Sequence, residues 1–540
     1  MQPYSGGEVK ETTWLEVKLH VKRMATCLSD LNLKDKSNII LLGENSAQWI
    51  MADLAIMLAG HVSVPMYSTL DVKTAQYIIE HCEAKALILG KMSIDNAGLK
   101  ALGELIEGLR IPIFSLSFAP ALKNAIDFEK RANRIVPEEI STFVNPDPDD
   151  LATIIYTSGS TGYPKGVMHS YKSMLSVTQA FVFSTDDRLL SYLPLAHAAE
   201  RALVETCALY YGCKVYFGES QETFITDLRR AGPTVFFSVP RLWIKFYQNV
   251  RINLSEDQDA LLEAGLAPSV LKNSVLTSLG LQNTRVAFTG SAPVPSEVVQ
   301  WYRDLGLELL DCYGMSENFA TSHFSQPGET RVGYVGKPVL GVETRLAESG
   351  EVLVKRPGQM LGYYKMPEKT ANEITEDGFF FTGDLGEIDD EGRLKITGRV
   401  KDIFKTSKGK YVAPVPIEQI VGSYPGVESV CVMGSGFPQP FAVLNLSEEG
   451  AVGKHNTAQK AALVIRLKKL LESVNKQIPK HENLKFLVVT DLPWGIDNGL
   501  LTPTLKIRRH VIEKRYSVLG EAWFDTQEEV VWFSETTDNA

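Results

Sequence analysis

Apolar runs and helical patterns alternate along most of the chain. Four continuous apolar runs are typical of buried strands, at residues 38–44, 62–67, 86–90 and 151–156. The segment 46–60 has the apolar pattern of a buried helix. Further short β-rich runs follow, several of them separated by helical patterns, at residues 191–196, 214–218, 234–240, 285–292 and 307–314. This alternation predicts an α/β fold in which helices cover largely parallel sheets.

The pattern changes near Gly333. Residues 350–361 and 378–399 predict a β-rich unit with tight turns, and Asp390-Glu391-Gly392 predicts a hairpin turn within it. A second, smaller α/β unit is expected after Arg399, with a helix over 458–477 between its strands. The acidic tail from residue 526 to 540 is expected to be loosely ordered.

These changes predict two domains. Residues 1–400 are expected to form a large N-terminal domain that includes the β-rich subdomain from about residue 333. Residues 401–540 are expected to form a small C-terminal α/β domain. The boundary is placed near Lys401, where the β-rich pattern ends.

Composition excludes some classes of protein. The 540 residues include 55 basic and 65 acidic side chains, and the net charge of −10 argues against a general nucleic-acid binder. The six cysteines are scattered without a C-x-x-C pair, so a reduced, cytoplasmic location is expected. The N-terminus lacks the apolar core of a signal peptide, and residues 49–67 carry Asp53 and His61, too polar for a membrane span. Peripheral contact with a membrane stays open.

A glycine-rich loop, TSGSTGYPKG at residues 157–166, directly follows the apolar run 151–156. Backbone N–H groups in such a turn can surround an anion, and hydroxyls and a lysine add donors and charge. A Walker loop does not fit because Gly166 follows Lys165, and the glycine intervals do not match a dinucleotide fingerprint. The loop therefore predicts a polyphosphate site, with candidate residues Thr157, Ser158, Gly159, Ser160, Thr161, Gly162 and Lys165.

The loop resembles the signature loop of the acyl-adenylate-forming enzymes, which include acyl-CoA synthetases, peptide-synthetase adenylation domains and firefly luciferase. Further stretches match that family in the same order: TGSAPV from 289, DCYGMSE from 311, TGDLG from 382, GRVKDIFKTSKGKYVAP from 398 and NGLLTPTLKIRR from 498. The resemblance extends from about residue 14 to 516. Ser316 stands where the family has threonine, and Leu505 where many members have glycine.

The resemblance implies a site for ATP and Mg²⁺. Tyr313 would stack on adenine, Ser316 would contact the α-phosphate, and Asp384 and Arg399 would bind the ribose. The magnesium ligands would be Glu317 and Thr157. The remaining residues of the predicted nucleotide site are Gly290, Ser291, Ala292, Asp311, Cys312, Gly314, Met315 and Ile396.

The resemblance also implies a two-step reaction and a mobile C-terminal domain. Lys506 would serve the first step, in which a carboxylate attacks ATP to give acyl-AMP and pyrophosphate. The domain would then turn about a hinge at Lys401 and Asp402, bringing Lys408 and Gly409 to the thiol donor. The candidate catalytic residues are Lys506, Glu317, His197 and Lys165.

The acid is indicated by SYLPLAHAAER, residues 191–201, which resembles the long-chain acyl-CoA synthetases. By that resemblance His197 lies near the acyl carboxylate and Arg201 acts as a gate at the mouth of a fatty-acid tunnel. A long- or medium-chain fatty acid with CoA as acceptor is therefore expected. An aryl-acid CoA ligase, an enzyme that acylates a separate carrier protein and a catalytically silent nucleotide-binding member stay open, as does the choice between monomer and homodimer.

Overall fold

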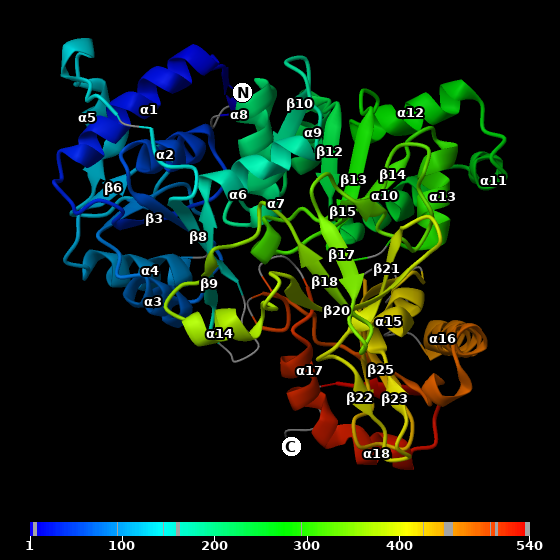
Figure 1. Ribbon diagram of the computed structural model, residues 1–540. Helices are drawn as coiled ribbons and strands as arrows, with labels where there is room; N and C mark the ends of the chain where they lie inside the picture. The colour runs from blue at the N-terminus through cyan, green and yellow to red at the C-terminus, as the bar shows by residue number, and fades with distance from the viewer. Residues whose placement is uncertain are drawn as a thin grey trace.

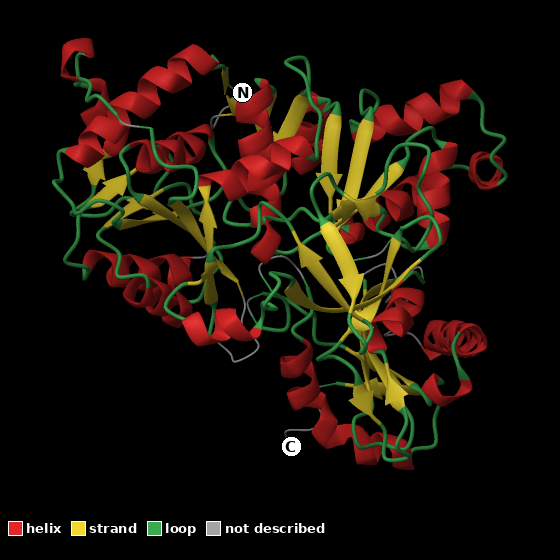
Figure 2. Ribbon diagram, viewed as in Figure 1, coloured by secondary structure: helices red, strands yellow, loops and turns green. Residues whose placement is uncertain are grey.

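The structure is a computed structural model that describes residues 1–3, 8–93, 96–143, 145–157, 163–292, 294–424, 426–447, 457–496, 498–502 and 506–534. Two large sheets with their helices form an N-terminal body, and the C-terminal residues form a smaller body below it in Figure 1. Figure 2 shows helices covering the outer faces of these sheets, as the alternating sequence pattern predicts. The α/β fold class is thus confirmed.

The first sheet contains the glycine-rich loop. Its strands lie in the order β19-β9-β8-β4-β3-β5-β6-β7, and the strands from β8 to β7 run parallel. Their bounds are β3 (Asn38–Leu42), β4 (Val62–Met66), β5 (Ala86–Leu89), β6 (Ile113–Ser115), β7 (Ile126–Asp127), β8 (Leu151–Thr157), β9 (Lys165–Ser170) and β19 (Gly362–Tyr363). The loop joins β8 to β9, which pair antiparallel, so Lys165 begins a strand.

Helices cover both faces of this sheet (Figure 1). Ile39 and Leu41 pack in one core with α1 (Trp14–Ser29), α2 (Ala47–Leu58) and α5 (Phe128–Asn133). Ile40 and Leu42 pack in another with α3 (Val72–His81) and α4 (Asn96–Glu107). Successive residues of a strand point to opposite faces, so the continuous apolar run fills two cores.

The second sheet has the order β12-β13-β14-β15-β16, with its first three strands parallel. These strands are β12 (Val235–Ser238), β13 (Val286–Gly290), β14 (Leu309–Tyr313), β15 (His323–Phe324) and β16 (Lys337–Pro338). The helices of its outer core are α9 (Phe224–Ala231), α10 (Pro240–Asn253), α12 (Ser269–Leu279) and α13 (Ser296–Asp304). Helix α11 (Glu256–Glu263) connects α10 to α12, and β10 (Arg188–Ser191) pairs with β11 (Lys214–Phe217) in a separate two-stranded sheet.

A helical layer lies between the two large sheets. Ile155 of β8 and Phe288 of β13 share one core with residues of α7 (Ala198–Glu200), α8 (Cys207–Tyr211) and the π-helical segment Arg201–Thr206 between them. The segment predicted to contact the acyl group therefore runs through the interior of the N-terminal body.

The β-rich unit and the C-terminal body follow. β17 (Glu343–Leu346), β18 (Glu351–Lys355), β20 (Phe380–Ile388) and β21 (Leu394–Arg399) form an antiparallel sheet. The predicted hairpin turn connects its last two strands, with Gly392 at a φ of 79°. The C-terminal sheet is β24 (Val427–Met433), β25 (Phe441–Leu446), β26 (Leu487–Thr490) and β27 (Val530–Phe533), and its main helices are α15 (Pro414–Gly422), α16 (Thr457–Gln477), α17 (Arg509–Tyr516) and α18 (Gly520–Asp525).

The expectation of a loosely ordered tail from residue 526 is wrong for its apolar part. Val530 to Phe533 pair in parallel with β26, and Val530 and Val531 are buried. Burial of these valines outweighs the acidic character of the flanking residues. Residues 535–540 lie outside the described part of the chain. None of the helices described has both the length and the hydropathy that a bilayer crossing requires.

Candidate active site

Strands of two different sheets bring three of the predicted nucleotide-binding residues into contact. The Tyr313 hydroxyl at the end of β14 donates a hydrogen bond to Oδ2 of Asp384 over 2.8 Å. Nε of Arg399 donates to Oδ1 of the same carboxylate over 2.7 Å. Asp384 and Arg399 are direct register partners of β20 and β21, so the hairpin itself sets this ion pair. The buried carboxylate can accept two hydrogen bonds from vicinal hydroxyls once these two donors give way.

A second cluster lies at the end of the glycine-rich loop. Nζ of Lys165 donates to Oε1 of Glu317 and to the hydroxyl of Tyr363, each over 2.7 Å. The side chains of Lys165 and Glu317 are only 18% and 11% exposed, so each charge is compensated chiefly by the other. Tyr363 was not predicted from the sequence. Its position, on a two-residue strand beside β9, follows from long-range pairing that no local motif encodes.

The two clusters share one apolar support. Val167, Val352, Tyr363 and Phe380 belong to a buried core against which the partly buried side chains of Tyr313, Met315 and Ile396 pack. Met315 and Ile396 were predicted on resemblance alone, and here they form part of the wall between the two polar clusters. The two clusters of predicted site residues are therefore joined by one apolar core.

The turn that carries Ser316 and Glu317 is held by its backbone. Nε2 of His169 donates to the Ser316 carbonyl over 2.6 Å, and the Met360 amide donates to the Glu317 carbonyl over 2.8 Å. Burial lowers the pKa of His169 to about 4, so this imidazole is neutral. Gly314 admits no side chain, because a Cβ would lie 2.4 Å from the Ala320 backbone.

A buried arginine supports the same turn from behind. Nη1 of Arg356 donates to the Asn318 carbonyl over 2.6 Å and also to the Thr321 carbonyl. Burial lowers the pKa of Arg356 to about 10. The turn includes Phe319 and Ala320 at positive φ, a conformation that non-glycine residues adopt only when their surroundings fix it. His169 and Arg356 are supports that the sequence analysis missed, since neither belongs to a recognised motif.

The other predicted nucleotide residues lie around this region. Gly290 ends β13 with its backbone against Cys312, and a Cβ there would lie 2.8 Å from the Cys312 carbonyl oxygen. Ser291, at a φ of 73°, and Ala292 are exposed to solvent. Burial raises the pKa of Asp311 to about 7. Ser158, Gly159, Ser160, Thr161 and Gly162 lie outside the described residues.

The C-terminal body brings Lys506 to the same region. Lys506 keeps part of its surface exposed to solvent. Desolvation by the surrounding protein and the positive charge of Arg399 nevertheless lower its pKa to about 8, and the negative charge of Asp384 opposes this shift. The charge of Lys506 also acts on His197 of the N-terminal body. A lysine on the far side of the predicted hinge thus faces residues of both β20 and α7.

His197 is held in one orientation at the start of α7. Its Nδ1 accepts a hydrogen bond from the Ala199 amide over 3.1 Å. Burial, with a contribution from Lys506, lowers the pKa of His197 to about 4. The ring is therefore neutral, and because Nδ1 accepts, the proton is on Nε2, which can donate to an oxygen.

The structure does not place Arg201 as a gate. Its side chain is 0% exposed, and its guanidinium binds Asp53, Oε2 of Glu205 at 3.0 Å and Oγ1 of Thr153 at 2.7 Å. The π-helical segment carries this side chain into the core between the sheets, where two buried carboxylates compensate its charge. Arg201 is therefore a structural ion-pair residue, and the expected position at a tunnel mouth is corrected.

The predicted hinge residues follow Arg399 closely in the chain, whereas the predicted CoA-side residues belong to a hairpin of the C-terminal body. Lys401 is exposed, and Nε of Arg509 lies 3.5 Å from Oδ2 of Asp402. Lys408 and Gly409 occupy the exposed turn of a hairpin, β22 (Phe404–Lys405) and β23 (Tyr411–Val412), at the lower end of the C-terminal body in Figure 1.

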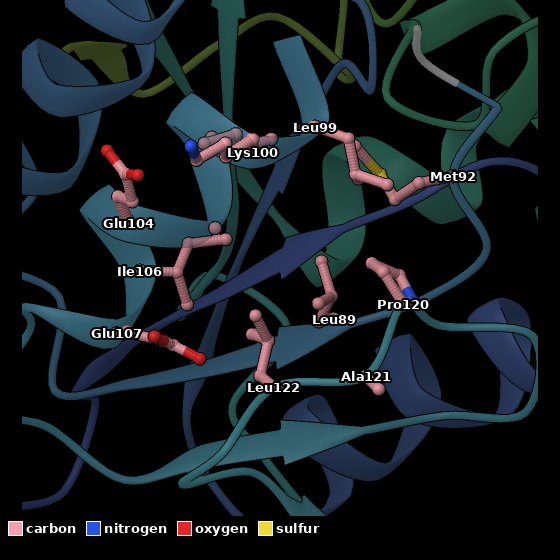
Figure 3. Close-up of a pocket in the computed structure, with 12 residues that line it drawn as sticks. Leu89, Met92, Leu99, Lys100, Glu104, Ile106, Glu107, Pro120, Ala121 and Leu122 are labelled. Atoms are coloured by element: carbon pink, nitrogen blue, oxygen red, sulfur yellow. The ribbon is translucent and has the colours of Figure 1, made fainter. Parts of the chain in front are cut away.

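Two observations suit a hard cation at the predicted magnesium site. Oγ1 of Thr157 is buried without a hydrogen-bond partner among the described residues, and Glu317 supplies a carboxylate. Mg²⁺ prefers oxygen ligands and is often bound through one or two protein groups plus phosphates. Elsewhere, a pocket of about 310 Å³ lies on the first sheet between α4 and the loop at Pro120–Leu122 (Figure 3), and its lining includes none of the predicted site residues.

Comparisons with known proteins agree with this geometry. The chain matches the family described as AMP-binding enzyme over residues 3–364 and the AMP-binding enzyme C-terminal domain over residues 401–528. It is 28% identical to the long-chain-fatty-acid–CoA ligase FadD15 of Mycobacterium bovis, covering 96% of this chain and 93% of that protein. It is 30% identical to long-chain-fatty-acid–CoA ligase 1 of Homo sapiens, covering 87% of this chain and 76% of that protein.

A solved structure shares the fold. The adenylation domain of the carboxylic acid reductase from Segniliparus rugosus, in complex with AMP and a co-purified carboxylic acid, has a TM-score of 0.78 to this chain. The two are 22% identical, and the likeness covers 96% of this chain and 88% of that one. At this identity the likeness concerns the fold alone.

Proposed function

Because the chain belongs to the AMP-binding enzyme family and is an adenylate-forming enzyme, we propose that it activates a long- or medium-chain fatty acid with ATP and transfers the acyl group to CoA. The products would be acyl-CoA, AMP and pyrophosphate. The single observation that carries the proposal is the hydrogen-bonded cluster of Tyr313, Asp384 and Arg399, whose charged members act on Lys506 of the C-terminal body. The choice of a fatty acid is supported by the names of the relatives and by the motif at residues 191–201.

In the first step a carboxylate oxygen of the acid attacks the α-phosphorus of ATP. The new O–P bond forms as the bond from that phosphorus to the pyrophosphate oxygen breaks, giving acyl-AMP and pyrophosphate. Asp384 and Arg399 would hold the ribose, and Tyr313 the adenine. The ammonium of Lys506 would offset negative charge that develops on the α-phosphate.

The ion pair between Lys165 and Glu317 has to open during this step. ATP brings phosphates that attract Lys165, and Glu317 with Thr157 would hold Mg²⁺, which supplies positive charge to those phosphates. The pair keeps both side chains ordered before the nucleotide binds, so little side-chain entropy remains to be lost on binding.

His197 would orient the acid. Its neutral ring donates from Nε2, which suits either a carboxylate oxygen or the carbonyl oxygen of the acyl-AMP. A cation at this place would bind the carboxylate more tightly and reduce its nucleophilicity, and the low pKa of His197 avoids that.

In the second step the CoA thiolate attacks the acyl carbon and AMP leaves. Lys408 and Gly409 lie at the far end of the C-terminal body in the present arrangement, so the proposal requires that body to turn. Lys401 and Asp402 would form the hinge, which needs only a few residues to change their backbone angles.

Acid-dependent exchange between ATP and radiolabelled pyrophosphate tests the adenylation step. We expect exchange with acids of about eight or more carbons, and thioester formation only after CoA is added. Lys506→Met should abolish exchange while the protein stays folded. Exchange with benzoate alone would favour an aryl-acid ligase, thioester formation only on a carrier protein would favour that acceptor, and no exchange with any acid would favour a silent member of the family.

A further inference from the structure

We propose that Tyr363 and Glu373 are positioning residues for Lys165, which hold its ammonium toward the phosphates once Glu317 has turned away. This inference rests on the proposed function, because it assigns a role within the same ATP site. Neither residue belongs to the motif that contains Lys165, and both lie about 200 positions further along the chain.

Three charged side chains contact the hydroxyl of Tyr363, namely Lys165, Glu317 and Glu373. Nζ of Lys165 donates to the Tyr363 hydroxyl over 2.7 Å and lies 4.2 Å from the centre of the Tyr363 ring. The hydroxyl lies 2.9 Å from Oε1 of Glu317 and 2.7 Å from Oε2 of Glu373. Lys369 donates to the other oxygen of Glu373 over 2.7 Å.

The phenol has two acceptors but a single proton. It can donate to Glu317 or to Glu373, not to both at once. A phenol is protonated at neutral pH, so the Tyr363 hydroxyl remains a donor to whichever of the two carboxylates is in reach. Burial raises the pKa of Glu373, but hydrogen bonds from Lys369 and Tyr363 outweigh this and hold it low, so Glu373 is ionised at neutral pH and can accept the hydrogen bond from the phenol.

ATP binding changes the partners of Lys165. When Glu317 leaves to serve the cation and phosphates, Lys165 loses its carboxylate and the phenol loses one acceptor. The phenol then donates its hydrogen bond to Glu373 alone, which leaves the lone pairs of the phenol oxygen aimed at Nζ of Lys165. The lysine thus keeps a fixed hydrogen bond and an aromatic face, and its remaining N–H bonds are free for phosphate oxygens.

The backbone fixes this arrangement. Lys165 and Val167 lie on the same face of β9, and Val167 is the register partner of Tyr363 on β19, so the two side chains meet across adjacent strands. The Tyr363 amide donates to Oγ1 of Thr370 in α14 (Pro367–Asn372), and Glu373 directly follows that helix. One short strand and one short helix therefore hold both groups behind the loop.

Equilibrium binding of ATP, measured by calorimetry in the presence of Mg²⁺, tests the proposal. Tyr363→Phe keeps the ring and removes the hydroxyl, and we expect the dissociation constant for ATP to rise by about tenfold or more, the usual effect of losing a hydrogen bond to a charged group. Adenosine, which lacks phosphates, should bind to this variant as it does to the native enzyme. Glu373→Gln keeps an acceptor but loses the charge, so a smaller change in the same direction is expected.

A double-mutant cycle separates positioning from general structure. In a Lys165→Met background Tyr363→Phe should cause no further loss of ATP affinity, because the residue it positions is already absent. The matched control is Tyr364→Phe: its hydroxyl accepts a hydrogen bond from Asn38, and its removal should leave ATP affinity unchanged. Equal losses in both backgrounds, or equal losses for ATP and adenosine, would overturn the proposal.

The outcomes also distinguish this inference from the proposed function. If the native enzyme exchanges pyrophosphate but the cycle is additive, the inference alone fails. If the native enzyme does not bind ATP, the proposed function fails and the inference with it. Should Tyr363→Phe not fold, Glu373→Gln and Lys369→Met are measured in the same cycle, since both side chains are partly exposed, and absence of coupling to Lys165 would again reject the idea.

Discussion

Arg241 of α10 and Glu428 of β24 form an ion pair that joins the N-terminal body to the C-terminal body. The pair exists in the arrangement that brings Lys506 to Asp384, and it would break if the C-terminal body turned. Both side chains are more than a third exposed, at 38% and 37%, so the pair contributes little energy. Loss of this pair is therefore expected to change the rate of adenylation relative to that of thioester formation.

We expect Arg241→Gln and Glu428→Gln each to slow pyrophosphate exchange by up to about fivefold, since exposed pairs are worth roughly 0.2–1 kcal/mol. Thioester formation from preformed acyl-AMP should not slow. The effect should disappear at high ionic strength, because salt screens exposed charges. Arg345→Gln is the matched control, as it breaks another exposed pair, with Asp377, that lies within the N-terminal body. A slower second step and an unchanged first step would contradict the prediction.

The pKa of Lys506, lowered to about 8, predicts an alkaline limit to adenylation. In the proposed function the charged form of Lys506 serves the first step, and this form is lost as the pH rises through the pKa. We expect kcat/KM for ATP to fall above about pH 8, since this ratio reports the free enzyme. The corresponding limb of kcat should lie at higher pH, because bound phosphates favour the ammonium.

Lys506→Arg provides the control for this profile. Arginine stays charged throughout the accessible range, so the alkaline limb near pH 8 should disappear even if the rate is lower. The measurement is the pH dependence of initial rates of pyrophosphate release. A limb that persists at the same pH in Lys506→Arg would assign it to another group.

The sequence predicted the layers of this fold better than the contacts within its site. Continuous apolar runs predicted four strands of the first sheet, β3, β4, β5 and β8, because the middle residues of each are buried whichever face of the sheet they point to. The tail was misjudged because its charge was weighed above a four-residue apolar run, and only pairing with β26 reveals that strand.

Motif resemblance identified residues that the structure brings together, including Tyr313, Asp384 and Arg399. It could not identify Tyr363 or Arg356, since their roles depend on register and on carbonyl groups presented by a distant turn. The position of Arg201 within a motif also suggested a gate. A motif does not determine the direction in which a side chain points, and the π-helical segment directs Arg201 into the core.

Arg201 is therefore expected to affect stability rather than acyl specificity. Arg201→Met would leave Asp53 and Glu205 buried without their cation, and the free energy of unfolding should fall by roughly 3–5 kcal/mol. Neutralising both carboxylates as well, with Asp53→Asn and Glu205→Gln, should recover part of this loss. Denaturant unfolding gives the free energies, and a panel of acids gives the specificity. A stable Arg201→Met enzyme with an altered chain-length preference would instead support the predicted role of Arg201 as an acyl gate.

The hinge prediction follows from what is held on each side of Lys401. Arg399 is bound to Asp384 of the N-terminal body, and Arg509 of the C-terminal body lies beside Asp402 and binds Glu418 over 2.6 Å. Only two residues, Val400 and Lys401, lie between these anchors. A turn of the C-terminal body that keeps both anchors must therefore change backbone angles in the stretch from Arg399 to Asp402, which contains the predicted hinge at Lys401 and Asp402.

Lys401→Pro should accordingly impair the second half-reaction. Proline fixes φ at its own position and restricts the preceding residue, so the backbone loses freedom at Lys401 and at Val400 before it. We expect thioester formation to fall by at least about tenfold while pyrophosphate exchange changes little, because the present arrangement already serves adenylation. Lys401→Ala is the control, since it removes the side chain and leaves the backbone free, and both of its half-reactions should stay near native rates. Equal losses in the two half-reactions of Lys401→Pro would place the pivot elsewhere.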